Sequence, residues 1–570
     1  MDRRLLLALL LTTVVVLAVP RLFPTPQQAT RPVAARAGDS TRAGTTATTP
    51  AATPPAMQPT AAAPAGDTTA GTAAALPAAK PDTVTVATPH VVYTFSTVGA
   101  HPIQARLTSY ESLRDKSQRV SLARDGVPLL RFRLAAGGDT VALDRMPFAV
   151  DSSAPATAGG LPGPLTFRAP IGPSGEATIR YDFTDDGYLT RVSGEVTGYP
   201  NAQLLINMPD GLRSEEVDSL DDIRHLAYVA KPVRDAARSI PFAKTDTALA
   251  QTETDGPYTW VASKNKYFLL AVIAPDSSQT LSSLRLTPTV RGKKALAKDV
   301  AATISRPLGP DGRFAFELYA GPQEWRRLNA LGRDLVDVNT YGWTFMKGII
   351  QPFGLAMMRL LLWMHDSLKI SYGWVLIIFG IAVRLILWPL NQSAMRNQLK
   401  MQAIQPELQA LQKKYMSDPQ KQQAEVMALY KRHGMSPFSP LMGCVPMLIP
   451  MPFLIALFFV FQSTIEFRGV PFLWLADISQ KDPYYILPIL MGLSMYLLSW
   501  IGMRNQPPNP QAKMLAYLMP AMMTFFLLNL AAGLNLYYAV QNIAAMPQQW
   551  LIARERAKSG AGSAVVAKAT

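Results

Sequence analysis

Residues 371–390 read SYGWVLIIFGIAVRLILWPL, and this stretch decides what kind of fold the chain can adopt. Nearly all of its side chains are apolar, and Arg384 is the one charged residue among them. An α-helix of about 20 apolar residues is long enough to cross the hydrocarbon core of a bilayer. The stretch therefore predicts a transmembrane helix, and it indicates that the chain is a membrane protein.

Similar apolar stretches follow along the chain. They predict further transmembrane helices at 438–462, 484–503, 513–530 and 534–552. At the start of the chain, Arg3 and Arg4 precede an uncharged run. Residues 1–23 are therefore expected to form an N-terminal transmembrane anchor, with a cleaved signal peptide as the alternative. The predicted membrane part is an α-helical bundle of five core transmembrane helices plus this anchor.

The distribution of charge predicts the orientation of these helices. Residues 391–436 carry seven Lys and Arg residues against three Asp and Glu residues, whereas the loop 463–483 has only Arg468 and Lys481 as basic residues. Short cytoplasmic loops of membrane proteins are enriched in Lys and Arg. The pattern predicts a multi-pass protein with both termini in the cytoplasm and a basic cytoplasmic tail at 553–570.

The residues between the anchor and the first core helix read as three sections. Residues 24–83 are rich in Ala, Thr and Pro, and such a composition predicts a disordered linker. Residues 84–325 show short alternating strands separated by Gly and Pro turns, which predicts a large all-β domain of sandwich type. Residues 326–370 carry apolar side chains at helical spacing, interrupted by charges, and predict linking and amphipathic interfacial helices.

The segment 391–437 has the pattern of a helical hairpin. Its apolar residues recur at steps of three and four, and the sequence Ser417-Asp418-Pro419 breaks the first helix and starts a second. The basic outer face of this cytoplasmic hairpin either docks a partner or is simply solvated. The residues expected to carry docking are Lys400, Lys413, Lys414, Tyr415, Lys431 and Arg432.

Arg384 is the residue of the membrane part that needs an explanation. An arginine near the centre of a transmembrane helix costs about 2.5–3.5 kcal/mol on insertion scales. One explanation is that its long side chain reaches the inner lipid headgroups. The other is that it lies in a polar interior of the bundle, because no Asp or Glu occurs within the predicted spans to neutralise it.

Two polar stripes favour a polar interior. At about 100° per residue, Gly373, Gly380, Arg384 and Asn391 lie on one helix face. The last predicted span has a matching face, and Gln462 closes the span before the outer loop. If the two stripes face one another, they line a hydrophilic, positively charged groove. The residues expected to line it are Arg384, Gly380, Asn391, Gln462, Asn535, Tyr537, Tyr538, Asn542 and Gln549.

Several longer motifs stand out in the predicted membrane part: 443–446 (GCVP), 465–474 (IEFRGVPFLW), 482–485 (DPYY), 532–538 (AGLNLYY) and Arg384 followed by Pro389. These motifs resemble the YidC/Oxa/Alb family of membrane protein insertases, in the YidC form of bacteria with an outer membrane. The resemblance covers about 340–555 closely. In the outer domain it is confined to short stretches such as 95–100 (FSTVGA).

The resemblance implies a function that spacing alone does not. It implies an insertase and chaperone of the bacterial inner membrane, with a β-supersandwich as its periplasmic domain. Arg384 would attract hydrophilic parts of a substrate, and Tyr537 and Tyr538 would lie where nascent segments slide past. Nascent membrane proteins would be the substrates. The further implied partners are the Sec translocon, the ribosome, the signal-recognition machinery and anionic lipids, with no specific nucleic-acid sequence.

Two other functions fit parts of the sequence. A small-solute transporter is disfavoured because the spans carry no acidic relay and no visible internal repeat. A carbohydrate-active outer domain is disfavoured because His90, His101 and His225 have no ligand or triad spacing near them. We expect no catalytic residue, metal or other cofactor. The net charge of +15 fits either an anionic partner or the charge bias of membrane proteins.

Overall fold

A computed structural model describes residues 82–152, 162–244, 252–276, 278–288, 299–339, 347–389, 392, 404–416, 418–433, 451–504 and 510–566. The chain divides into two compact units, Met1–Ala78 and Ala79–Thr570, and all described residues belong to the second. The predicted anchor and nearly all of the predicted linker lie outside the described residues. So do Asn391 and Lys400.

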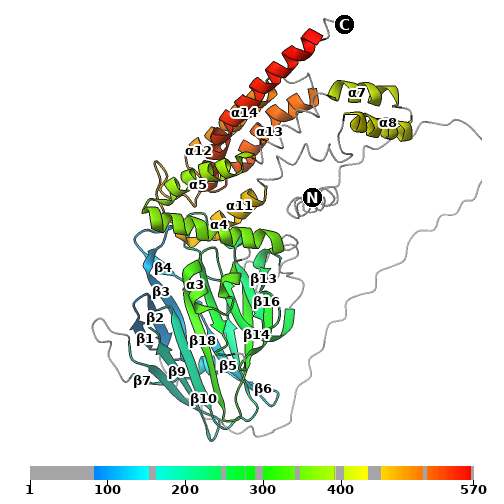
Figure 1. Cartoon of the computed structure of the whole chain (residues 1–570). Helices are drawn as coiled ribbons and strands as arrows, with labels where there is room; N and C mark the ends of the chain where they lie inside the picture. Colours follow the sequence, from blue (N-terminus) through cyan, green and yellow to red (C-terminus); the bar gives the residue numbers. More distant parts are fainter. Residues whose placement is uncertain are drawn as a thin grey trace, which may run out of the picture. The chain divides into compact units, whose positions relative to one another are not determined.

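The segment predicted as an all-β domain forms two antiparallel sheets (Figure 1). One sheet has the order β1-β2-β3-β4, and the other follows β6-β5-β11-β17-β16-β14-β15-β18-β10-β9-β8-β7, with β12 and β13 paired beside β14. The strands are β1 (Thr83–Ala87), β2 (Val91–Ser96), β3 (His101–Glu111), β4 (Arg119–Ser121), β5 (Arg131–Ala136), β6 (Asp139–Val141), β7 (Ala149–Ser152), β8 (Leu165–Ile171), β9 (Gly175–Phe183), β10 (Leu189–Val196), β11 (Gln203–Met208), β12 (Ala227–Pro232), β13 (Arg238–Pro241), β14 (Thr252–Lys264), β15 (Phe268–Ile273), β16 (Leu281–Pro288), β17 (Val300–Pro307) and β18 (Arg313–Pro322).

Strand β9 shows why this sequence forms a sheet with a buried face. Ile179, Tyr181 and Phe183 are buried and alternate with more exposed polar residues, because successive side chains of a strand point to opposite faces. The strand ends in a tight turn. Gly187 adopts a φ of +72° there, and the Thr184 hydroxyl donates to the carbonyl oxygen of Leu189 at 2.7 Å. This hairpin aligns β10 beside β9 in antiparallel register.

The rest of the described chain is helical (Figure 1). Its helices are α3 (Trp325–Leu331), α4 (Lys347–Leu368), α5 (Tyr372–Ile386), α7 (Gln405–Lys414), α8 (Pro419–Arg432), α11 (Met451–Ser463), α12 (Ile486–Met503), α13 (Pro510–Leu527) and α14 (Ala532–Val566), with the 3-10 turns η3 (Leu335–Val338) and η4 (Ile465–Phe467). The short helix α2 (Ser219–Arg224) belongs to the β-domain.

Within the described residues, α12 is long and apolar enough to cross a membrane alone. Residues 350–368 of α4 and 372–386 of α5 meet the same criterion only together, and they are bent by 116° at Lys369–Ser371. Shorter apolar helices occur at Phe453–Ser463 and Ala516–Leu527. Helix length and composition therefore support fewer than the five predicted core spans. The number of spans stays a prediction.

The surface of these helices is apolar. On α12, Ile489, Leu493 and Trp500 are 58%, 53% and 43% exposed, while Leu487 and Met491 are buried. On α5 the exposed side chains include those of Trp374, Ile378, Ile381, Leu385 and Ile386. Large apolar faces turned outward are the arrangement expected of helices solvated by lipid tails.

Candidate functional site

Arg384 lies on the last turn of α5 and is half-buried. Its Nη2 donates to the side-chain Oε1 of Gln548 on α14 at 3.1 Å. Its Nε is buried without a hydrogen-bond partner, and no carboxylate in the described part of the chain pairs with it. The guanidinium is thus bound by a neutral amide, and its Nε–H donor stays without a partner.

Gln548 connects three parts of the site. Its side chain is almost fully buried, and its Nε2 donates to the carbonyl oxygen of Trp388 at 3.2 Å and to Oε1 of Gln392 at 3.4 Å. Because its Oε1 accepts from Arg384, both ends of the amide are used. Gln548 therefore ties the arginine and the segment after α5 to the middle of α14.

Three predicted groove residues of the last span do not face Arg384. Asn542 Nδ2 donates to Ser494 Oγ of α12 at 3.1 Å, and Asn535 Nδ2 donates to the carbonyl oxygen of Leu527 at 3.0 Å. The amide of Gln549 lies near Gly502 of α12. The prediction that these three residues oppose Arg384 is wrong, since they turn toward α12 and α13. Tyr538 packs against both the cluster of α12 and α13 and the cluster that contains residues of α5.

The face of α14 that meets α5 contains Tyr537, Gln541 and Gln548. Tyr537 stacks on Phe379 with ring centroids 5.8 Å apart. Gln541 Nε2 donates to the carbonyl oxygen of Gly380 at 2.7 Å and to the Tyr537 hydroxyl at 3.2 Å. Tyr537 is one of the predicted groove residues, and helical spacing from it reaches Gln541 and Gln548, which the prediction omitted.

Gly380 has a packing role at this contact. A Cβ atom placed there would lie 3.0 Å from Val540 Cγ1 and 3.6 Å from the ring of Tyr537. Its missing side chain lets α5 and α14 approach closely, so its carbonyl oxygen can be reached by Gln541. Gly380 therefore lets α5 and α14 pack closely beside Arg384. This packing role differs from the predicted role of lining an open groove.

Gln462 lies near the other end of α5. Its neighbour Phe461 stacks on Phe467 at 4.9 Å, and Phe467 meets Tyr372, at the start of α5, at 5.0 Å. Arg384 is twelve residues further along that helix, which corresponds to about 18 Å. Gln462 is therefore not placed beside the arginine.

The segment predicted as a hairpin contains two helices that run back along one another. Gln422 Nε2 of α8 donates to the carbonyl oxygen of Gln412 at 2.9 Å, and His433 Nε2 lies 3.3 Å from Glu407 Oε2. Asp418 caps α8 by accepting from the backbone N–H of Lys421. The described basic residues of the docking prediction, Lys413, Lys414, Lys431 and Arg432, are exposed, and Tyr415 is half-buried beneath the Lys414 ammonium.

A two-sheet β-domain joined to helices with apolar outer faces, with an arginine at a helix contact that pairs with no described carboxylate, defines a membrane protein with a polar site between its helices. Family models extend this class. Residues 363–559 match the model described as 60Kd inner membrane protein, and residues 83–353 match the YidC periplasmic domain.

Several curated relatives are named membrane protein insertase YidC. The protein of Chlorobaculum tepidum is 32% identical over 392 residues, which cover 65% of this chain and 64% of the relative. The protein of Chlorobium limicola is 30% identical over 412 residues, which cover 68% of each chain. A solved structure of an active YidC insertase with its first transmembrane domain resolved is 18% identical, covers 82% of this chain and 92% of that one, and has a TM-score of 0.34.

The chain belongs to the YidC family of membrane protein insertases. The family resemblance seen in the sequence is thereby confirmed, together with a location in the inner membrane and a periplasmic β-rich domain. The relatives are named for insertion of membrane proteins, which agrees with the interpretation of the chain as an insertase instead of an enzyme.

Proposed function

We propose that this chain inserts nascent membrane proteins into the inner membrane by giving their polar segments a cationic, hydrogen-bonding site at lipid depth. The observation that carries the proposal is Arg384, whose guanidinium is bound by one neutral amide and has a buried, unused Nε. A cation in this position is expensive to insert, and such residues in membrane helices generally serve function. An acidic or carbonyl-rich part of a guest could use the free donors.

The surrounding amides support this role. Gln541 and Gln548 make the face of α14 that meets α5 polar next to Tyr537, and Gln548 holds Arg384 in place there. A guest whose polar flank binds there would meet a lower barrier to moving partway across the bilayer. Its apolar part would then leave toward lipid, where burial stabilises it by about 25 cal/mol per Å².

The proposed arrangement in the membrane has five core spans and an N-terminal anchor, with both termini in the cytoplasm. Helix α4 would lie in the outer interface, because Trp363 and Leu360 are exposed on it near Arg359 and Asp366, and it bends sharply into α5. The α7–α8 hairpin would dock partners through its exposed basic residues. Those partners would be the ribosome, the signal-recognition machinery, the Sec translocon and anionic lipids.

Replacing Arg384 tests the role of its charge. We expect Arg384→Ala, in the full chain reconstituted into liposomes, to lower insertion of a single-span substrate with an acidic translocated flank by about tenfold or more, which corresponds to one charge-assisted hydrogen bond. Arg384→Lys should retain most of the activity, and a substrate with a neutral flank should respond less. Equal insertion of the acidic substrate by Arg384→Ala would contradict the proposal.

Access of water to the site can be measured separately. The single native cysteine, Cys444, is first replaced by Ser, and Arg384→Cys is then introduced. A membrane-impermeant thiol reagent added from the cytoplasmic side should label this variant. Ile381→Cys, at a lipid-facing position one turn away on α5, serves as the control and should stay unlabelled. A lack of labelling at position 384 would count against a hydrated site.

A further inference from the structure

The segment 464–468, between α11 and the outer loop, contacts the helices and the β-domain in alternation. The Thr464 hydroxyl lies 3.7 Å from the sulfur of Met358 on α4, and Phe467 is buried in the apolar cluster of the helices. Ile465 is instead buried in the main core of the β-domain. Arg468 also turns to the β-domain. Four of these five residues therefore contact either the helices or the β-domain, and the segment joins the two.

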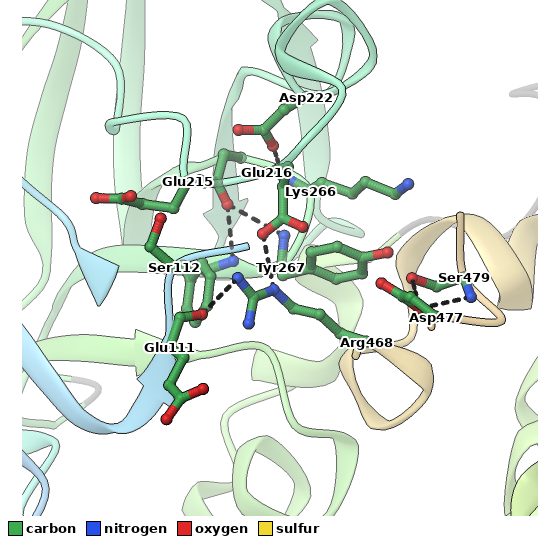
Figure 2. A network of polar contacts seen from close by, with 12 residues as sticks. Glu111, Ser112, Glu215, Glu216, Asp222, Lys266, Tyr267, Arg468, Asp477 and Ser479 are labelled. Atoms are coloured by element: carbon green, nitrogen blue, oxygen red, sulfur yellow. Dashed lines mark hydrogen bonds and ion pairs between the residues drawn. The ribbon is translucent and has the colours of Figure 1, made fainter. Parts of the chain in front are cut away.

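Arg468 enters a buried site on the β-domain (Figure 2). Its Nε lies 2.7 Å from Oε1 of Glu216, and the two side chains are only 4% and 3% exposed. Its Nη2 donates to the carbonyl oxygen of Glu111 at 3.0 Å. Its guanidinium also lies 5.3 Å from the ring centre of Phe268 and 5.9 Å from that of Tyr267.

Among the described side chains of the β-domain, none forms an ion pair with Glu216; Lys266 lies close enough to act on its charge but pairs with Asp221 at 2.8 Å. The neighbouring Glu215 pairs with Arg213 at 3.1 Å, and Asp222 accepts from the backbone N–H of Lys266 at 3.0 Å. Glu216 Oε1 is paired across the junction, and its Oε2 is buried without a hydrogen-bond partner. The cation that neutralises this carboxylate comes from a residue 252 positions away in the chain.

We propose that residues 464–468 form a latch that holds the β-domain on the outer ends of the membrane helices, and that Arg468 and Glu216 are the pair on which the latch depends. Removing one partner of a buried ion pair leaves an uncompensated charge, whereas replacing both by apolar residues is often neutral. The β-domain and the outer end of α11 therefore move together while the pair is intact. This inference concerns the assembly of the chain and does not rest on its insertion activity.

Amide hydrogen exchange of the full chain in lipid nanodiscs tests the latch on both sides. The probes are the N–H of Ile478, bonded to the carbonyl oxygen of Val470 in the loop, and the N–H of Leu113, bonded to that of Glu215 in the β-domain. We expect Arg468→Leu and Glu216→Leu each to raise exchange at both amides by about 100-fold. The double variant should return to within about tenfold of the parent chain.

Two controls separate opening of the latch from other effects. Arg326→Ala removes an ion pair to Asp366 at the same junction, with side chains 55% and 45% exposed, and should change exchange less than about fivefold. The amides between β9 and β10 should stay protected in all variants. Unchanged exchange in the single variants, a double variant that adds the effects of both, or exchange that spreads to β9 and β10 would each overturn the proposal.

Discussion

The β-domain and the membrane helices use the same apolar residue types in opposite ways. In the β-domain, Trp260, Tyr181 and Phe167 are fully buried, and few large apolar side chains reach its surface. In the helices, Leu493 of α12 and Leu385 of α5 are 53% and 61% exposed. The difference follows from the solvent. Burying an apolar side chain lowers the free energy in water, whereas it brings no such gain among lipid tails.

The two regions also satisfy their backbone hydrogen bonds in different ways. Each strand of the β-domain needs a neighbouring strand for its hydrogen bonds, and the large sheet supplies one on each side for most of them. Helices satisfy their own backbone groups and can therefore face lipid. As a result, long-range pairing builds the β-domain, while each membrane helix forms within its own segment.

Two arginines show how charge is handled in the two regions. Arg468, at the contact with the β-domain, meets a carboxylate and a backbone carbonyl oxygen. Arg384, on a lipid-facing helix, meets one glutamine. The first arrangement neutralises the charge, as expected of a residue that stabilises the fold. The second leaves the charge available, which suits a site for a guest.

The largest expected effect comes from the core of the β-domain. Trp260 is fully buried on β14 and donates through Nε1 to the carbonyl oxygen of Arg333 at 2.9 Å. Trp260→Ala should destabilise the domain by about 3–5 kcal/mol, because it leaves a cavity and an unpaired carbonyl group. Thermal unfolding monitored by proteolysis measures the change. Trp500→Ala, at an exposed position of α12, is the matched control and should cost less than about 1 kcal/mol.

Two exposed leucines give the sharpest comparison between the regions. Leu493→Arg, at the middle of α12, should cost about 2.5–3.5 kcal/mol of membrane insertion and reduce the membrane-integrated fraction. Leu220→Arg, at a position 68% exposed on α2 of the β-domain, should change stability by less than about 0.5 kcal/mol. Similar losses in both variants would show that α12 faces water and not lipid.

A smaller effect is expected from pH at the junction of the two regions. Glu466 accepts from the backbone N–H of Trp325 at 3.3 Å, and burial, aided by Glu324, raises the pKa of Glu466 to about 7. Since its ordinary pKa is 4.5, the protonated form is favoured in the folded junction. The stability contributed by this group is full below about pH 4.5 and is lost as pH rises through about 7.

Replacing the carboxyl by an amide should remove this dependence. The protection factor of the Trp325 amide is expected to fall between pH 5 and pH 8 in the parent chain, by an amount worth about 1–3 kcal/mol. Glu466→Gln keeps the acceptor oxygen without the charge, so its profile should be flatter. A parent chain with a flat profile, or a variant as steep as the parent, would disagree with the assignment.

The sequence by itself determined those features that depend on neighbours along the chain. Alternation predicted a domain of short strands at 84–325, apolar length predicted the helices at 371–390 and 484–503, and the motifs led to the family. Each of these signals repeats every two to four residues or lies in one short stretch. A period of about 3.6 residues also placed Asn535, Asn542 and Gln549 on one helix face, and all three turn toward α12 and α13.

The tertiary structure alone decided which faces meet. Helical periodicity gives the members of a stripe but not the rotation of the helix, so the contact of Arg384 with Gln548, one position before the predicted Gln549, needed the packing of α5 against α14. The pair of Arg468 and Glu216 joins residues 252 positions apart, and neither segment carries a local sign of the other. Such contacts depend on how folded elements pack, because burial and charge pairing act between surfaces that exist only after each element has formed.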